Sequence, residues 1–398
     1  MFLVIIAWCI FFFSTPVVLF YAITNFIIAT RFTRWGNKPD KLNSGKVTII
    51  VPVRNDFSIF HSIDSMRRIN YPDYEILIVD DSSDSLFSLK LNTLNDEKTE
   101  VIHRSEHIGG KAGALNYVLQ TVNSSYTVIF DADHHPIPEF LNKAVSTIEE
   151  TQADCVCGYQ RHIIGGEKVF DNFYRACHAA AIVNFKSRNI LGLGTIFGGG
   201  CAIFNTRWLQ KHLFDETSIT EDWELSLRSY LEDDFKIVIR DDLVAYAAIP
   251  KNAKAFIRQQ LRWAEGTIAD YKKYFRVMLK SKIRRLTKLG LFYQGFYFAV
   301  GLAVTLSWTL FLLPNLGLPL LLTGPLLVFF IISWASTFYR GMSLESYGRK
   351  KMAKCFVFGF LLSIAMSPIY AYATIRGLLK RRTFLWKVTE RQDTPDGT

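Results

Sequence analysis

The chain has 398 residues, a formal net charge of +10 and a hydrophobic fraction of 49%, and its mean hydropathy of +0.14 is high for a soluble enzyme. The basic residues gather beside apolar stretches and between residues 272 and 288, without the aromatic-basic pattern of a nucleic-acid reader. We therefore expect membrane lipids, and no nucleic acid, as their partners. The six cysteines form no C-x-x-C pair, which argues against a zinc site or a disulfide framework.

The first predicted element is a transmembrane helix over residues 1–30. No charge occurs from Phe2 to Thr30, a stretch too long for the apolar core of a signal peptide. Three basic residues follow it, Arg31, Arg34 and Lys38. Because basic residues flank the cytoplasmic end of a membrane helix, we expect an integral protein of the cell (plasma) membrane whose next domain is cytosolic.

Residues 41–250 predict a globular α/β domain. Apolar runs of strand length alternate with helical patterns, which is the order that builds a parallel sheet. The predicted strands are Lys46–Arg54, Tyr74–Asp81, Glu100–His103 and Tyr126–Phe130, and the helices between them are Phe57–Ile69 and one that opens at His107–Asn116. This alternation is typical of a nucleotide-binding fold.

Two of these strands end in paired carboxylates. Ligands of open α/β sheets bind beside the carboxyl ends of the strands, so we expect both pairs in one crevice. Asp131 and Asp133 predict a Mg²⁺ or Mn²⁺ site that also holds a diphosphate. The alternative is a turn in which they cap backbone amides. Asp80 and Asp81 are expected to bind a nucleobase or ribose, or else to cap a helix.

A lysine and a third acidic cluster complete the predicted site. Lys111 follows two glycines at the start of a helix, without P-loop spacing, and is expected to contact a nucleotide. Asp222 lies near a helix N-terminus, which keeps a carboxylate charged, so we predict that it is the general base for an acceptor hydroxyl. The alternative is a capping box formed with Glu224.

Residues 251–288 predict amphipathic helices at the membrane interface. The helix expected over Phe256–Tyr274 carries Gln259, Arg262 and Trp263 on neighbouring turns. Arg262 offers a planar fork that matches a phosphate, and Trp263 offers a flat face for a sugar ring. Without the acidic clusters, this would be an ordinary basic helix on a membrane surface.

Residues 289–376 predict about three further transmembrane spans, and residues 377–398 a basic tail. Leu289–Tyr339 carries no charge and is broken near its middle by two prolines and a glycine, and Cys355–Ile375 is the last apolar segment. Three spans would leave the basic tail outside the cell, against the positive-inside rule. Either Cys355–Ile375 is re-entrant or interfacial, or it spans the membrane despite the basic residues that follow it.

Together these motifs resemble those of the membrane family 2 glycosyltransferases. This group includes cellulose, chitin and hyaluronan synthases and the nodulation chitooligosaccharide synthase, with ceramide glucosyltransferase as a near relative. In chain order, the matching motifs are Val51–Asp56, Asp80-Asp81, Gly109–Asn116, Asp131-Ala132-Asp133, Thr220-Glu221-Asp222 and Gln259-x-x-Arg262-Trp263. The resemblance implies the α/β GT-A fold, a Rossmann-like nucleotide-sugar-binding domain, here joined to α-helical transmembrane segments.

The same resemblance implies an inverting, metal-dependent hexosyltransferase whose donor is a nucleoside-diphosphate sugar, with a UDP-sugar expected. It assigns the nucleoside to Asp80 or Asp81 with Lys111, and the metal (Mg²⁺ or Mn²⁺) and diphosphate to Asp131 and Asp133. It also assigns the base to Asp222, the pyrophosphate to Gln259 and Arg262, and acceptor stacking to Trp263.

Two acceptors stay open. A growing polysaccharide, as in the processive synthases, is the first. However, the F-x-C-G-S-like motif of polymer synthases is replaced here by Phe197-Gly-Gly-Gly-Cys201, and the span pattern resembles that of the nodulation synthase and of the ceramide glucosyltransferases, which add one sugar to a lipid. Transfer of a single sugar to a membrane lipid is therefore the alternative. A membrane protein that only senses a nucleotide is a distant third, because the set of metal, base and phosphate residues is complete. No oligomeric state, sugar or linkage is predicted.

Overall fold

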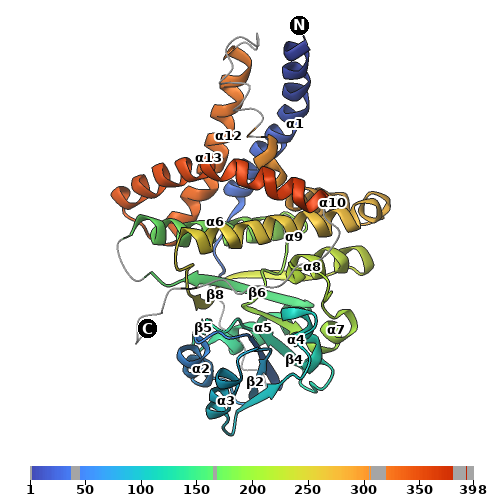
Figure 1. Cartoon of the computed structure of the whole chain (residues 1–398), viewed down its shortest axis with the longest axis vertical. Coiled ribbons are helices and arrows are strands. Elements are labelled where there is room, and N and C mark those ends of the chain that lie inside the picture. Colours follow the sequence, from blue (N-terminus) through green and yellow to red (C-terminus); the bar gives the residue numbers. More distant parts are fainter. Residues whose placement is uncertain are drawn as a thin grey trace.

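The computed structural model describes residues 2–36, 45–164, 168–303, 305, 320–379 and 391. Figure 1 shows an elongated molecule with a sheet domain at one end and two helices, α1 and α12, projecting from the other. Between them lies a layer of long helices, among them α6, α9 and α13. The molecule therefore has a sheet domain, a middle helical layer and a projecting helical end.

The sheet domain is built on eight strands in the order β3-β2-β1-β4-β7-β6-β8-β5. The first four of these are parallel to one another, whereas β7 runs antiparallel to both β4 and β6. In chain order the strands are β1 (Val47–Val53), β2 (Tyr74–Asp80), β3 (Thr99–His103), β4 (Tyr126–Ile129), β5 (His135–Pro136), β6 (Cys155–His162), β7 (Ala202–Asn205) and β8 (Ile237–Ala247). The parallel strands β1 to β4 agree with the sequence prediction to within about two residues.

Helices cover both faces of the sheet, which explains why its strands are apolar on both sides. Along β1, Ile49 enters the core on one face and Ile50 the core on the other, and both are fully buried. The helices of this domain are α2 (Ile59–Arg67), α3 (Ser85–Leu91), α4 (Gly110–Leu119), α5 (Phe140–Thr151), α7 (Thr206–His212) and α8 (Glu221–Glu232). A 3-10 turn, Asn92–Leu94, follows α3.

The middle layer contains α6 (Val169–Ile190), α9 (Ala253–Lys280), α10 (Arg285–Gly295) and α13 (Arg349–Leu379). Helix α9 begins at the N-cap Asn252, whose side-chain oxygen accepts a hydrogen bond from the Ala255 amide at 2.9 Å. It includes the predicted helix Phe256–Tyr274 and extends it at both ends. Helix α13 packs along α9 and α6 (Figure 1).

The projecting helices are α1 (Phe2–Arg31) and α12 (Leu320–Leu344), which pack against each other. Within the described ranges, α13 is the helix that is long and apolar enough to cross a membrane, and Thr15–Arg31 is a shorter apolar helix. The prolines and glycine that were expected to separate two spans fall in residues 306–319, outside the described residues. The predicted number of spans therefore stays a prediction.

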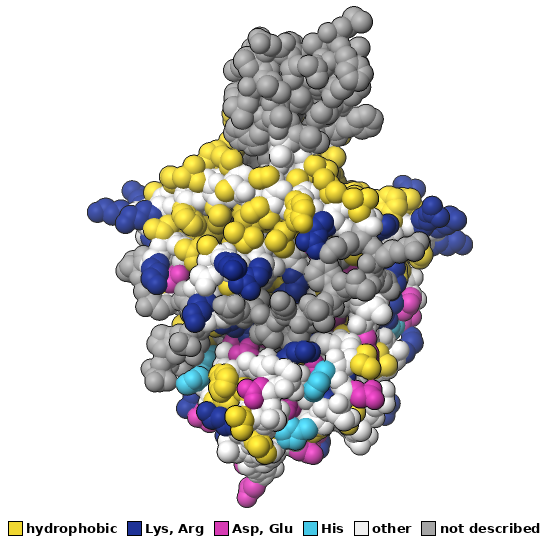
Figure 2. Space-filling view, viewed as in Figure 1, with side chains coloured by type: hydrophobic (Ala, Val, Ile, Leu, Met, Phe, Trp, Pro, Cys, Tyr) yellow, Lys and Arg dark blue, Asp and Glu magenta, His cyan; other side chains and the backbone are white. Residues whose placement is uncertain are grey.

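The position of α13 bears on the orientation of the predicted segment Cys355–Ile375. In Figure 1, α13 lies across α1 and α12 rather than alongside them, and it runs beside α9. Figure 2 shows a belt of hydrophobic side chains at this level, with Lys and Arg side chains at its two ends. Exposed apolar residues of α10 and α13 include Leu286, Leu289, Val357 and Leu361. This arrangement favours the interfacial alternative for Cys355–Ile375.

A buried carboxylate joins α12 to the sheet domain. The side chain of Glu345, at the end of α12, is 1% exposed. It lies 3.0 Å from Arg161 of β6 and also pairs with Arg175 of α6, while the Tyr159 hydroxyl donates to it at 2.8 Å. Strand β6, helix α6 and helix α12 are therefore tied together at one point.

Candidate active site

The predicted metal ligands lie together at the end of β4. Single ligand atoms of Asp131, Asp133 and His134 lie within 4.8 Å of one another. Asp133 is 1% exposed, and its second oxygen accepts a hydrogen bond from the Ala248 amide at 2.9 Å. Burial raises the pKa of Asp133 to about 6, against the opposing charge of Arg391. Two carboxylates and one imidazole form a donor set that suits Mg²⁺ or Mn²⁺.

A basic side chain from the predicted tail already neutralises these carboxylates. Arg391 lies 2.5 Å from Asp133, 3.2 Å from Asp56 and 4.0 Å from Asp131. Its backbone forms a bridge with Pro250, just after β8. The guanidinium group of Arg391 thus lies beside the acidic pair, as expected of carboxylates that bind positive charge. The sequence interpretation did not include Arg391, because nothing local relates it to Asp133.

Lys111 lies at the centre of the site. Its ammonium group is 2.6 Å from Asp131, 3.4 Å from Glu221 and 2.5 Å from the Gly199 carbonyl oxygen. Although burial alone would lower the pKa of Lys111, the charges of Asp131 and Glu221 outweigh it and raise the pKa. Lys111 therefore stays charged and connects the metal-ligand pair to the start of α8.

The predicted base, Asp222, is the second residue of α8. Burial, together with the charge of Glu221, raises the pKa of Asp222 to about 7. The capping-box alternative is wrong, because Thr220 makes no side-chain capping bond and Glu224 pairs instead with Arg228 at 3.0 Å. Asp222 is thus held in a partly buried position where its protonation can change near neutral pH.

A glycine brings backbone close to Asp222. Gly199 has φ +82°, and a Cβ built on it would lie 3.1 Å from an Asp222 carboxylate oxygen. Any other residue would be strained by this backbone conformation, and its side chain would crowd Asp222. The backbone of the three consecutive glycines therefore approaches Asp222 closely at Gly199.

Asp270 of α9 fixes the turn that leads into α8, and the sequence interpretation missed it. It accepts hydrogen bonds from the hydroxyls of Ser218 at 2.6 Å and Thr220 at 3.0 Å. Close approach of the two elements requires Gly266, since a Cβ there would lie 2.5 Å from the Thr220 hydroxyl oxygen. One feature of the sequence could have identified Asp270. It lies one helical turn after Gly266, on the helix face that carries Gln259 and Trp263.

The predicted nucleoside ligands lie at the end of β2 and are held by basic side chains. Asp80 lies 2.8 Å from His103, and although burial would raise its pKa, hydrogen bonds from Ser82, Ser88 and His103 outweigh this and lower it. Asp81 pairs with Arg104 at 2.5 Å and Arg54 at 3.2 Å.

The helix-cap alternative for this pair is wrong. The N-cap of α3 is Asp84, whose side chain accepts from the Leu86 and Phe87 amides. Asp80 and Asp81 therefore keep the position at the carboxyl edge of the sheet that the nucleoside interpretation required.

The predicted site residues of α9 have different surroundings. Gln259 accepts a hydrogen bond from the Tyr174 hydroxyl at 2.9 Å, and Trp263 lines a cavity of about 510 Å³ that also reaches Asp222. The charge of Arg262 lowers the pKa of Asp222 and so acts on the base. The structure therefore brings Asp131, Lys111 and the start of α8 into direct contact, whereas Asp80, Asp81 and Gln259 make contacts of their own around them.

Comparisons with known proteins agree with this geometry. Residues 48–213 match the family described as glycosyl transferase family 2. The chain is 26% identical, over 91% of its length and 68% of the relative, to glucomannan 4-beta-mannosyltransferase 7 of Arabidopsis thaliana. It is 27% identical, over 60% of its length and 52% of the relative, to the beta-monoglucosyldiacylglycerol synthase of Trichormus variabilis. The chain thus spans between half and about two thirds of these relatives.

A solved structure shares the whole fold. The mannosyltransferase PcManGT from Pyrobaculum calidifontis, in complex with GDP-Man and Mn²⁺, superposes with a TM-score of 0.65. The two sequences are 20% identical, and the match covers 95% of this chain and 99% of that one. The predicted GT-A arrangement of a Rossmann-like domain with added helices is therefore confirmed.

Proposed function

We propose that this protein, whose residues 48–213 match glycosyl transferase family 2, is a glycosyltransferase that transfers a sugar, with inversion, from a nucleoside-diphosphate sugar to an acceptor hydroxyl in a metal-dependent reaction. The observation that carries this proposal is the double pairing of Lys111. Its ammonium group reaches Asp131 at 2.6 Å and Glu221 at 3.4 Å. The metal-ligand pair and the base-bearing helix thereby belong to one site.

Donor binding is assigned to the carboxyl edge of the sheet. Asp131 and Asp133, with His134 beside them, would hold Mg²⁺ or Mn²⁺, which neutralises the diphosphate when it is bound. Lys111 and Arg262 supply fixed positive charge for the leaving diphosphate, and Gln259 supplies an amide. Asp80 or Asp81 is assigned to the nucleoside. A UDP-sugar remains the expected donor, and the GDP-Man complex of PcManGT makes GDP-sugars the first alternative to test.

Asp222 is assigned the role of general base. A pKa of about 7 lets it accept a proton from the acceptor hydroxyl at neutral pH. The hydroxyl oxygen attacks the anomeric carbon as the bond to the diphosphate breaks, and the proton passes to Asp222. A single displacement inverts the anomeric centre and needs no covalent enzyme intermediate.

The acceptor is first a growing polysaccharide, in line with the glucomannan mannosyltransferase among the relatives. A membrane lipid is the second candidate. It is favoured by the cavity that runs from Asp222 between the helices of the middle layer, and by the similarity to a synthase named for a diacylglycerol product. The exposed apolar belt of α10 and α13, with basic residues at its ends, supports a location in the cell membrane with the sheet domain in the cytosol (Figure 2).

The test uses detergent-purified full-length protein with Mn²⁺ or Mg²⁺ and a panel of UDP- and GDP-sugars. Release of nucleoside diphosphate is measured, and products are sized on gels and by lipid extraction. We expect metal-dependent release with one donor and no release by Asp222→Asn. A ladder of products supports the polysaccharide, and a single lipid product supports the second candidate. Donor binding without turnover in any lipid or glycan mixture would favour a nucleotide sensor instead.

A further inference from the structure

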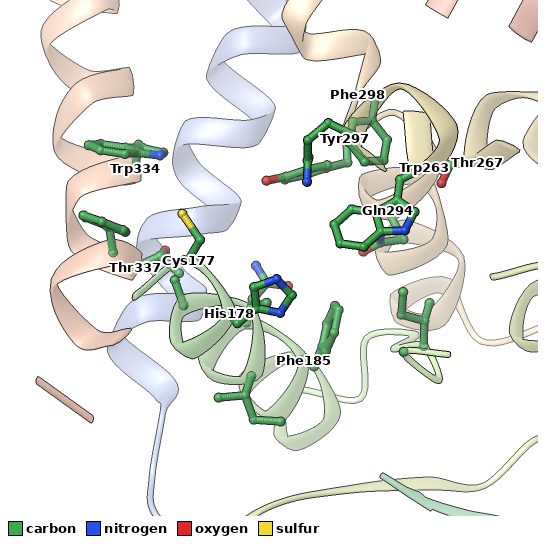
Figure 3. Close-up of a pocket in the computed structure, with 18 of the residues that line it drawn as sticks. Cys177, His178, Phe185, Trp263, Thr267, Gln294, Tyr297, Phe298, Trp334 and Thr337 are labelled. Atoms are coloured by element: carbon green, nitrogen blue, oxygen red, sulfur yellow. The ribbon is translucent and has the colours of Figure 1, made fainter. Parts of the chain in front are cut away.

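The cavity beside the base has walls of unusual chemistry. It occupies about 510 Å³, has Asp222, Gly198 and Gly200 among its lining, and extends between α1, α6, α9, α12 and α13. Figure 3 shows side chains from several of these helices converging on it, among them His178, Trp263 and Trp334. Since it begins at the base and leads away from the metal ligands, it lies on the acceptor side of the reaction.

Charge separates this cavity from the donor side of the site. Among the lining residues that the structure describes, there is no lysine, arginine or glutamate, and Asp222 is the single aspartate. The donor side, in contrast, contains Lys111 and Arg391 beside its carboxylates. A phosphate buried among these lining residues would have no lysine or arginine of the cavity wall to pair with, which costs free energy.

A histidine, His178, faces the cavity from α6. His178 packs its ring against His162, with centroids 4.0 Å apart, and against Tyr174 at 4.6 Å. Burial lowers the pKa of His178 to about 4, so its imidazole is neutral at physiological pH. A neutral imidazole offers one hydrogen-bond donor and one acceptor but no charge.

The ring nitrogens of His178 are available to a ligand. Within the described part of the chain, neither nitrogen has a hydrogen-bond partner from the protein. The Trp263 ring, which also lines the cavity, lies beside His178 in an edge-to-face arrangement, with the two ring centroids 6.3 Å apart at an angle of 65° (Figure 3). Tyr174, which packs on His178, is itself held by Gln259 at 2.9 Å. The imidazole is thus fixed by packing, with its polar atoms unused.

We propose that His178 is a specificity-determining residue that, side by side with Trp263, binds the uncharged sugar or polyol group of the acceptor, so that the site takes neutral acceptors and rejects phosphorylated ones. This inference rests on the proposed function. The same neutral polyhydroxyl chemistry is offered by the end of a polysaccharide and by the headgroup of a glycosylated lipid. Hydroxyl groups pair well with a neutral imidazole, and a sugar ring packs well on an indole face.

The test measures transfer to matched pairs of acceptors by the full-length protein. The pairs are a neutral oligosaccharide with its monophosphorylated form, and a glycosyl diacylglycerol with the same lipid monophosphorylated on its sugar, so that both members of each pair keep free hydroxyl groups. We expect transfer to the neutral member of at least one pair, with kcat/KM lower by about 100-fold for the phosphorylated member. Which pair reacts identifies the source of the sugar group. Equal use of both members of the reactive pair would overturn the proposal.

Variants locate the effect at His178. His178→Phe keeps a ring but loses both polar atoms, and we expect it to raise the acceptor KM by about five- to tenfold. His178→Gln, which can still donate and accept, should recover most of the loss. His61→Phe, on the exposed face of α2, is the matched histidine control. It should leave the KM for the acceptor and the KM for the donor unchanged.

Donor hydrolysis separates the two proposals. Transfer to water and the donor KM should be unaffected by His178→Phe, because the donor binds on the other side of Asp222. An unchanged acceptor KM in this variant, with normal donor hydrolysis, would overturn the role of His178 alone. If the wild-type protein neither binds nor hydrolyses any donor, the proposed function fails instead. Donor binding by calorimetry establishes that each variant is folded, and the acceptor-pair test on the wild-type protein needs no variant.

Discussion

The hydroxyl of Thr220 donates a hydrogen bond to Asp270 across 3.0 Å, and this contact joins the turn before the base to the middle of α9. Ser218 reaches the same carboxylate oxygen at 2.6 Å. Helix α9 also carries Gln259, Arg262 and Trp263. The helix that is assigned to the pyrophosphate and the acceptor therefore also positions the turn that leads to Asp222, the proposed base.

Replacing this carboxylate should loosen the base. Asp270→Ala leaves two hydroxyls without their partner, which costs about 1–3 kcal/mol of stability. We expect kcat to fall by about tenfold while the donor KM stays the same, because the donor side is untouched. Asp270→Asn keeps a hydrogen-bond acceptor and should recover most of the activity. A fall in donor affinity equal to the fall in kcat would contradict this positioning role.

The reaction should depend on pH through Asp222. Its pKa of about 7 means that the carboxyl is protonated, and unable to accept a proton, in acid. The transfer rate is therefore expected to rise with pH up to about 7 and then level off. The profile of kcat against pH checks this.

A second carboxyl titrates in the same range, so a control is needed. Burial raises the pKa of Asp270 to about 7, against hydrogen bonds from Ser218 and Thr220. Asp270→Asn should keep the rise near pH 7 because Asp222 is still present. Loss of the rise in this variant would assign the titration to Asp270.

Arg391 should compete with the metal for Asp133. The guanidinium group lies 2.5 Å from Asp133 and would have to yield part of this contact to a divalent cation. In the absence of donor, Arg391→Ala is expected to bind Mn²⁺ about tenfold more tightly, whereas Arg391→Lys should differ little from the wild type. Calorimetric titration with Mn²⁺ measures both. Weaker Mn²⁺ binding by Arg391→Ala would show that Arg391 supports the metal site rather than opposing it.

The carboxylate at the end of α12 should be a large contributor to stability. Glu345 is buried between Arg161 and Arg175, so Glu345→Ala leaves two arginines facing each other without their counterion. We expect the free energy of unfolding to fall by about 3 kcal/mol. This is the lower end of the range for removing one partner of a buried ion pair, because Arg161 is partly exposed. Thermal unfolding in detergent measures it, with Glu345→Gln as the isosteric control. A melting temperature equal to that of the wild type would exclude this contribution.

Local patterns predicted the positions of the carboxylates that are assigned to the donor. The strands β1, β2 and β4 are apolar runs that end in polar residues, so the sequence alone places Asp80 and Asp131 at the edge of a sheet. The same holds for Asp222, whose place near a helix N-terminus follows from the residues around it. In these cases the residues that carry the signal lie within a few positions of the residue that is predicted.

Contacts between distant segments could not be predicted in this way. Arg391 meets Asp133, Asp270 meets Thr220 and Glu345 meets Arg161 only because the chain folds back on itself. No periodicity or spacing relates such partners. The course of α13 beside α9 is of the same kind, since hydropathy shows that a segment is apolar but not which way it runs.

The most direct test of the central claim separates donor binding from turnover in Asp222→Asn. Donor affinity is measured by calorimetry and nucleoside diphosphate release by a coupled assay, with Mn²⁺ present and the donor that the wild-type protein uses. If Asp222 is the base, the variant should bind the donor as the wild type does while its turnover falls by about 100-fold or more. Turnover by Asp222→Asn at the wild-type rate would contradict the account.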